Sequence, residues 1–412
     1  MGSRAASFLA VDATVVIQDL AVIMVVASVM ALASFKLKQP MILGYIIAGI
    51  IIGPNIPPGN LLLEADAVNV FAQIGIILLL FVVGLEFPVN RLRVIGRKAT
   101  VIASTKVLGT FAVGYLVAYA LGFSPFDRLF VALSIAVTST VVALKVMEGL
   151  GMVKEEAASL IVAISIVEDV MVISALALLQ SIASTGTLSV PQLAVSTGLV
   201  ALFIGGTILL GSRTIPRFMN FVARSNNEEL LLIAMLGVAF GLAIVGSKLG
   251  ISVATGAFLA GVVVAESKAV DPARVISRPL RDMFSAIFFV SMGALMNIFL
   301  IPIFIVPALI LVLASVTMKF VLSVSAATVQ GYQRSLSLKA GVGLSGTGGE
   351  MSLVVAKGGA DVAATSAFVL PMIGVITLIT TFLSPYIMKV GWKQVDQRWA
   401  EPQKTPPQAA TP

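Results

Sequence analysis

Apolar runs of about 20 residues recur along the whole chain, and they restrict its fold more than any other feature. A helix of that length crosses the hydrocarbon core of a bilayer. Of the 412 residues, 58% are hydrophobic and only 11% are charged, whereas soluble domains carry about 25% charged residues. A spanning segment must satisfy its own backbone hydrogen bonds. The sequence therefore predicts an all-α membrane protein.

Thirteen membrane-spanning segments are predicted, and Lys and Arg are concentrated in alternate loops. The spans cover residues 11–35, 40–54, 66–87, 98–121, 127–148, 155–183, 190–212, 228–247, 250–266, 279–299, 302–329, 336–357 and 363–389. The odd-numbered loops and the segment after the last span hold most of the basic residues. By the positive-inside rule, this pattern predicts an N-terminus outside and a C-terminus in the cytoplasm, in the plasma membrane. It also explains the net charge of +7 without a nucleic-acid partner.

One transmembrane domain is expected over residues 1–400, followed by a disordered tail over 401–412, which is rich in Pro, Gln and Ala. No signal-peptide cleavage site is evident, so the first apolar run is expected to be a retained span. The chain contains neither cysteine nor histidine. A thiolate metal site and a histidine pH switch are thereby excluded, and proton chemistry must use other side chains. No cofactor is expected.

Short sequence matches recur about 210 residues apart, in the same order in both halves. Residues 44–49 match 256–261, residues 81–84 resemble 289–293, Lys106 corresponds to Lys319, and residues 138–140 correspond to 345–347. Each partner lies seven spans further on, and seven is odd, so the second copy must be inverted in the membrane. We therefore expect an inverted-topology repeat of spans 1–6 and 8–13, linked by span 7, with its site near the bilayer midplane.

Two adjacent carboxylates, Glu168 and Asp169, lie midway through the sixth span. Acidic residues at this depth are costly and usually functional, although an ion pair that merely joins helices is the plainer alternative. Adjacent helical residues point about 100° apart, so the two need not share one role. A carboxylate in a semi-dry cavity has a raised pKa and can hold either a proton or a cation. That competition is what an exchanger requires.

A lysine, Lys319, lies deep in the eleventh span and needs a partner there. We expect it to pair with Glu168 or Asp169, and favour such an ion pair, tested on Glu168, over the alternative of a proton-carrying role. Lys106, nearer the end of the fourth span, is expected to extend its ammonium to the membrane surface. Glu86, at the end of the third span, is expected to be interfacial and structural.

Small polar residues interrupt two apolar spans at repeat-related positions, residues 136–140 and 344–350. Glycine and threonine weaken helices, and unwound backbone at membrane depth must line a cavity or be buried in protein. We predict two broken helices that cross near Asp169, although a small-residue packing face is the alternative. The candidate cation ligands there are Thr138, Ser139, Thr140, Ser345, Thr347 and Glu350.

The motifs that carry these residues resemble those of the cation:proton antiporter-2 family, which includes Kef-type potassium efflux systems and sodium/proton antiporters. The similarity runs from about Gln39 to Pro385 and includes residues 40–54, residues 80–86 (LFVVGLE) and residues 348–350 (GGE). Asp169 takes the place of the family's ion-binding aspartate and Lys319 that of its basic residue. Many sodium-type members carry Asp-Asp and Kef-type members carry Gln-Asp, whereas this chain has Glu-Asp. The choice between Na⁺ and K⁺ therefore stays open.

The resemblance implies a homodimer in membrane lipid that exchanges a monovalent cation, Na⁺ or K⁺, for protons by alternating access at Asp169. Spans 1–3 and 8–10 would form a scaffold, and spans 4–6 and 11–13 a mobile core. Three other classes compete. A channel would need a continuous polar path, and an organic-anion symporter would need a larger and more basic cavity. A membrane hydrolase with Ser345 as nucleophile would lack a histidine base. A transporter and not an enzyme is expected.

Overall fold

The computed structural model describes residues 13–37, 39–54, 61, 65–85, 89–185, 198–199, 202–249 and 253–399, and within these ranges it contains helices and no strand. The helices are α1 (Ala13–Lys36), α2 (Met41–Ile52), α3 (Ala65–Leu85), α4 (Val89–Ala120), α5 (Pro125–Ala136), α6 (Thr140–Gly149), α7 (Glu156–Thr185), η1 (Thr207–Gly211), α9 (Ser212–Ala223), α10 (Glu228–Lys248), α11 (Val253–Val264), α12 (Val270–Ala294), η2 (Ile298–Leu300), α13 (Ile301–Val329), α14 (Arg334–Ser345), α15 (Glu350–Asp361) and α16 (Val369–Trp399).

Six of these helices are long and apolar enough to cross a membrane, and the chain is a multi-pass membrane protein. They lie in α1, α4, α7, α10, the η2–α13 segment and α16. Three shorter helical segments are also apolar: α2, the Val70–Leu85 part of α3, and α11. Part of the predicted seventh span, 190–212, and the predicted tail, 401–412, lie outside the described residues, as does Glu86.

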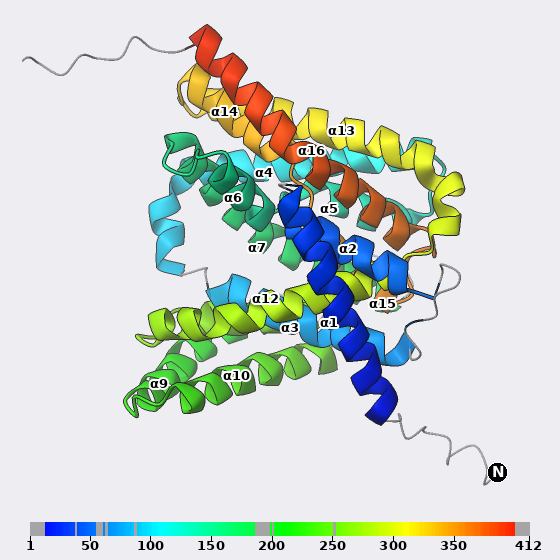
Figure 1. Cartoon of the computed structure of the whole chain (residues 1–412). Coiled ribbons are helices and arrows are strands. Elements are labelled where there is room, and N and C mark those ends of the chain that lie inside the picture. Colours follow the sequence, from blue (N-terminus) through cyan, green and yellow to red (C-terminus); the bar gives the residue numbers. More distant parts are fainter. Residues whose placement is uncertain are drawn as a thin grey trace, which may run out of the picture.

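The helices pack as two groups (Figure 1). In the first, which we call the α3 group, α3 packs against α11 and α12, α2 packs against α1 and α12, and α10 packs against α11. In the second, which we call the α4 group, α4 packs against α5, α7 and α13, and α14 packs against α13 and α16; α6 and α15 complete it. In Figure 1, α4, α13, α14 and α16 fill the upper part of the molecule and α3, α10 and α12 the lower part.

Glycines allow the closest helix crossings within the α3 group. A Cβ placed on Gly49 of α2 would lie 2.0 Å from the carbonyl oxygen of Val290 in α12. A Cβ on Gly261 of α11 would lie 2.0 Å from the carbonyl oxygen of Phe81 in α3. Gly49 and Gly261 are partners in the sequence repeat, so the repeated glycines serve two equivalent backbone contacts. Any larger residue would force these helices apart.

Candidate ion-binding site

Two interrupted helices meet inside the α4 group. Residues 137–139 separate α5 from α6, and residues 346–349 separate α14 from α15. The backbone N–H of Ser139 donates a hydrogen bond to the carbonyl oxygen of Thr347, at 3.2 Å. The two non-helical segments therefore touch directly, and both are buried in protein, as backbone polar groups at this depth require.

The local sequence explains why the chain restarts as a helix after the first interruption. Ser139 is extended, and its hydroxyl accepts a hydrogen bond from the backbone N–H of Val142 at 3.1 Å, which caps the N-terminus of α6. Gly349 immediately precedes α15 and lies against the same serine. A Cβ on Gly349 would be 2.3 Å from the Cβ of Ser139, so only glycine fits at this contact.

Backbone carbonyls left without helical partners at the ends of α5 and α14 are satisfied by side chains. Ser315 of α13 donates its hydroxyl to the carbonyl of Ile135 at 2.9 Å. Lys319, one turn further along α13, donates its ammonium to the carbonyl of Val137 at 2.6 Å. The hydroxyl of Thr138 donates to the carbonyl of Leu344 at 3.3 Å. A cation at the C-terminal end of α5 is also favoured by the helix dipole.

Glu168 is fully buried in α7, and its partner is Lys106 of α4. The Lys106 ammonium lies 2.6 Å from Glu168 Oε2, and it also donates a short hydrogen bond to the hydroxyl of Thr138. The expected Glu168–Lys319 pair is therefore wrong for this structure, as is the expectation that Lys106 extends to the membrane surface. Lys106 is 0% exposed, because its side chain points into the bundle at the helix interruption.

Asp169 follows Glu168 in α7 and faces the start of α6. Thr140, the first residue of α6, donates its hydroxyl to Asp169 Oδ2 at 3.0 Å. Asp169 is 6% exposed, whereas Glu168 is 0% exposed. Of the two adjacent carboxylates, one is thus fixed by a buried lysine and the other lies at the end of an interrupted helix. The N-terminus of α6 carries a partial positive charge that favours an anion there.

The site concentrates four ionisable side chains in a buried volume: Lys106, Lys319, Glu168 and Asp169. With all four ionised, their charges cancel. Adding one proton or one monovalent cation at Asp169 changes that sum by the same single positive charge. The site can therefore exchange a proton for a monovalent cation without a change in its net charge.

The remaining predicted ligands do not converge on Asp169 in this structure. The Ser345 hydroxyl donates to the carbonyl of Val342 at 2.9 Å, and the Thr347 hydroxyl to that of Gly343 at 3.5 Å. Both hydroxyls therefore turn back onto α14. Glu350 begins α15, but its side chain lies outside what the structure describes.

A polar cluster between the two helix groups was not predicted from the sequence. A cavity of about 20 Å³, enough for roughly one water molecule, is lined by Gln73 of α3 and by Gln180, Lys357 and Asp361 of α7 and α15, among others. Lys357 forms an ion pair with Asp361. Lysine and aspartate four residues apart near the end of a span were a usable signal, since such pairs lie on one helix face.

Comparisons with known proteins agree with this architecture. The family model described as "Sodium/hydrogen exchanger, transmembrane" matches residues 21–390. YbaL of Escherichia coli strain K12, named as a cation/proton antiporter, is 30% identical over 282 residues, which are 66% of this chain and 50% of YbaL. The chain thus matches about half the length of that relative. The Na(+)/H(+)-K(+) antiporter GerN of Bacillus cereus is 24% identical over 365 residues, covering 88% of this chain and 93% of GerN.

A solved structure gives the same fold. The sodium proton antiporter MjNhaP1 from Methanocaldococcus jannaschii superposes with a TM-score of 0.72 at 17% identity, covering 93% of this chain and 98% of the other. At that identity the likeness concerns the fold. Because the family model spans most of the sequence, the chain belongs to the sodium/hydrogen exchanger family of cation/proton antiporters, which are transporters and not enzymes.

Proposed function

We propose that this protein exchanges a monovalent cation, Na⁺ or K⁺, for protons by alternating access, with Asp169 as the site that both occupy in turn. The observation that carries the proposal is the placement of Asp169. Its carboxylate lies nine-tenths buried beside Thr140, at the point where two helix interruptions meet. Buried carboxylates have raised pKa values in general, which allows protons to compete with cations.

The neighbouring carboxylate supports this division of roles. Glu168 is held by Lys106 at 2.6 Å, and a buried carboxylate with a fixed ammonium partner is poorly suited to exchange it for a mobile cation. Asp169 accepts a hydrogen bond from the Thr140 hydroxyl. Thr138, Ser139, Ser345, Thr347 and Glu350 remain proposed contributors of oxygen ligands, in a state of the transport cycle that exposes Asp169 further.

The two packing groups support a moving-core mechanism. We infer that the α3 group is the scaffold and that the α4 group, with α5–α6 and α14–α15 as its crossed broken helices, moves as a unit. The α4 group carries the four ionisable residues of the candidate site, and a small polar cavity lies at its boundary with the α3 group. Sliding at that boundary would expose Asp169 to one side and then the other.

Exchange by purified protein in proteoliposomes tests the function. With vesicles that are acidic inside and a pH-sensitive dye that reports the gradient, Na⁺ or K⁺ added outside should dissipate the gradient when wild-type protein is present. Asp169→Asn should abolish this response, because an amide cannot trade a proton for a cation. Asp271→Asn is a matched control on an exposed carboxylate in the first turn of α12, outside the site and outside the boundary cavity. Equal rates in wild type and Asp169→Asn would exclude Asp169 as the shared site.

The same vesicles distinguish the cations. GerN is named for Na⁺, H⁺ and K⁺, and both Na⁺ and K⁺ are candidates here. Titrating Na⁺, K⁺ and Li⁺ side by side gives the concentration of each that produces half-maximal exchange. A response to none of the three would contradict the proposed substrate class.

The proposed orientation places the N-terminus outside and the C-terminus in the cytoplasm of the plasma membrane. It rests on the loop distribution of Lys and Arg. The chain contains no cysteine, so Ser3→Cys and Ala409→Cys provide single labelling sites. In intact cells a membrane-impermeant maleimide should label the first and spare the second; the reverse pattern would invert the topology.

We also propose that the protein is a homodimer, as its family resemblance implies. Light scattering of the purified protein, corrected for bound detergent, should give twice the 42.9 kDa of one chain. A mass of one chain at micromolar concentration would contradict the proposal.

A further inference from the structure

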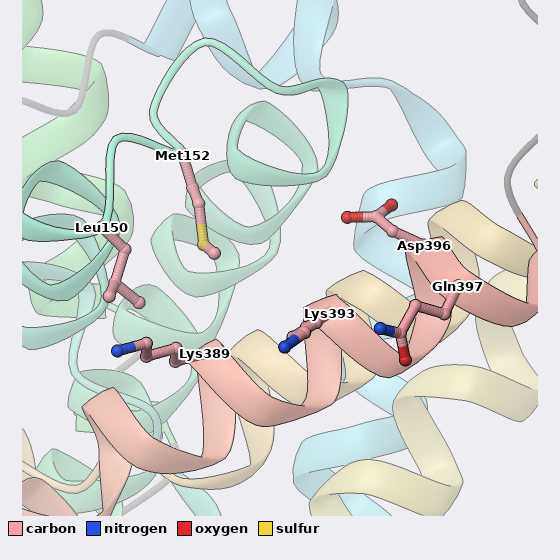
Figure 2. Close-up of a pocket in the computed structure, with 6 residues that line it drawn as sticks. All are labelled: Leu150, Met152, Lys389, Lys393, Asp396 and Gln397. Carbon is pink, nitrogen blue, oxygen red and sulfur yellow. The ribbon is translucent and has the colours of Figure 1, made fainter.

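A pocket outside the ion-binding site lies between α16 and the turn that joins α6 to α7 (Figure 2). Its volume is about 500 Å³, and it is lined by Leu150 and Met152 of the turn and by Lys389, Lys393, Asp396 and Gln397 of α16. In Figure 2 the side chains of Leu150 and Met152 extend from the turn toward α16, which carries the two lysines. None of these residues belongs to the cluster around Asp169.

The pocket carries an excess of positive charge. Lys389 and Lys393 are four residues apart, so they project from one face of α16. Neither has a hydrogen bond or an ion pair with any other residue that the structure describes. Asp396, in contrast, is neutralised by Lys339, whose ammonium lies 2.7 Å from its carboxylate and 2.7 Å from that of Glu155. Because one ammonium is shared by two carboxylates, these five groups leave one net positive charge at the pocket, and the ammonium groups of Lys389 and Lys393 are the ones placed to attract an anion.

An exposed apolar stripe on α16 leads directly to the two lysines. Phe382, Tyr386 and Val390 are exposed and recur at four-residue intervals. At about 100° per residue they share a helix face with Lys389 and Lys393. A ligand at this position contacts exposed apolar side chains along the stripe and the ammonium groups of the two lysines. Leu150 and Met152 continue the apolar surface across the pocket.

We propose that this pocket binds an anionic phospholipid, with its phosphate headgroup at Lys389 and Lys393 and an acyl chain along the stripe of Phe382, Tyr386 and Val390. Basic pockets between spanning helices on the cytoplasmic side are suited to anionic headgroups. A small soluble anion would be attracted by the same lysines but would leave the apolar wall and stripe uncovered. A zwitterionic lipid would bring its own cation against the two ammonium groups.

The position of the pocket predicts how a bound lipid affects the α4 group. Thr381 of α16 donates its hydroxyl to the carbonyl of Gly348, in the second helix interruption, at 3.0 Å. The turn on the other side of the pocket leads into α7, which carries Asp169. A lipid held between α16 and this turn therefore joins two elements of the α4 group. Its binding stabilises that group as a unit.

Thermal unfolding of the full chain in detergent tests the proposal, with phosphatidylglycerol, phosphatidylcholine and inorganic phosphate added separately. A ligand that binds the folded state raises Tm in a concentration-dependent way. Phosphatidylglycerol should raise the Tm of the wild type by several degrees, whereas the other two should leave it unchanged. An equal rise with phosphate alone would show a free-anion site and overturn the lipid assignment.

Paired variants show where the lipid binds. Lys389→Gln with Lys393→Gln should lose the phosphatidylglycerol shift, each sample being compared with its own lipid-free Tm. Lys268→Gln with Arg278→Gln removes the same charge from exposed positions in the turn between α11 and α12 and on α12, and this variant should keep the phosphatidylglycerol shift. A full shift in the pocket variant, or its loss in both variants, would contradict a specific site. Counting bound lipids by native mass spectrometry gives the same comparison for a variant of low starting stability.

Discussion

The two buried lysines illustrate how different roles arise from one residue type. Lys106 neutralises a buried carboxylate, whereas Lys319 binds a backbone carbonyl at the end of α5. Removing one member of a buried pair leaves an uncompensated charge, which costs about 3–5 kcal/mol. Removing Lys319 leaves the Val137 carbonyl short of a donor, a loss of about 1–3 kcal/mol.

A double-mutant cycle separates these roles. We expect Lys106→Met and Glu168→Gln to destabilise the fold singly, and the double variant to recover much of the loss because both charges are gone. The coupling energy, from unfolding free energies of the four proteins, should exceed that of the parallel Lys319→Met and Glu168→Gln cycle. Additivity to within about 0.5 kcal/mol in the Lys106 cycle would contradict the ion pair.

The sequence identified most residues of the site but not their partners. Polar residues within apolar runs predicted both helix interruptions and singled out Asp169, Glu168 and Lys319. The choice between Lys106 and Lys319 depends on the rotation of α4 and α13 about their axes, which hydropathy does not determine. Lys106 is bonded to the Glu168 carboxylate, whereas Lys319 is bonded to the carbonyl of Val137. The repeat relation between the lysines was the available sign that Lys106 is buried.

At the scale of helices, glycine positions determine how closely the elements of the α3 group approach. Gly49 and Gly261 stand where a Cβ would overlap a carbonyl of the crossing helix. Gly237 of α10 has nothing within 4 Å of such an added atom. These glycines therefore differ in function although all lie within helices.

Alanine substitution should have opposite effects at the two kinds of position. Gly49→Ala forces α2 away from α12, and overpacking of this kind costs about 1–3 kcal/mol. Gly237→Ala introduces a better helix former into open space and should stabilise the helix by about 0.5–1 kcal/mol. Thermal unfolding of both variants beside the wild type checks this. A Gly49→Ala protein as stable as the wild type would contradict the close crossing.

Helix boundaries were predicted less well than helix positions. The fourth span was expected from residue 98, but α4 begins at Val89; the tenth was expected from 279, but α12 begins at Val270. Hydropathy marks the part of a helix that contacts hydrocarbon, whereas charged turns can extend it beyond the bilayer. The interruptions were easier to locate, because Gly, Ser and Thr stand there within otherwise apolar runs.

For the whole molecule, the central claim is that a cation and a proton compete for one carboxylate. Lys106, Lys319, Glu168 and Asp169 have charges that cancel when all four are ionised, and either a proton or a cation adds one positive charge at Asp169. If the site is shared, a cation can bind only after the proton leaves. Proton release then accompanies cation binding even in detergent solution, where no membrane gradient exists.

Calorimetric titration with Na⁺ or K⁺ in two buffers of different ionisation enthalpy measures this release directly. We expect about one proton released per cation bound at a pH where Asp169 is protonated, and an apparent affinity that falls as the pH is lowered. Asp169→Asn should bind without releasing protons or not bind at all, whereas Asp271→Asn should behave as the wild type does. Cation binding by the wild type with no proton released across the pH range would contradict a shared site at Asp169.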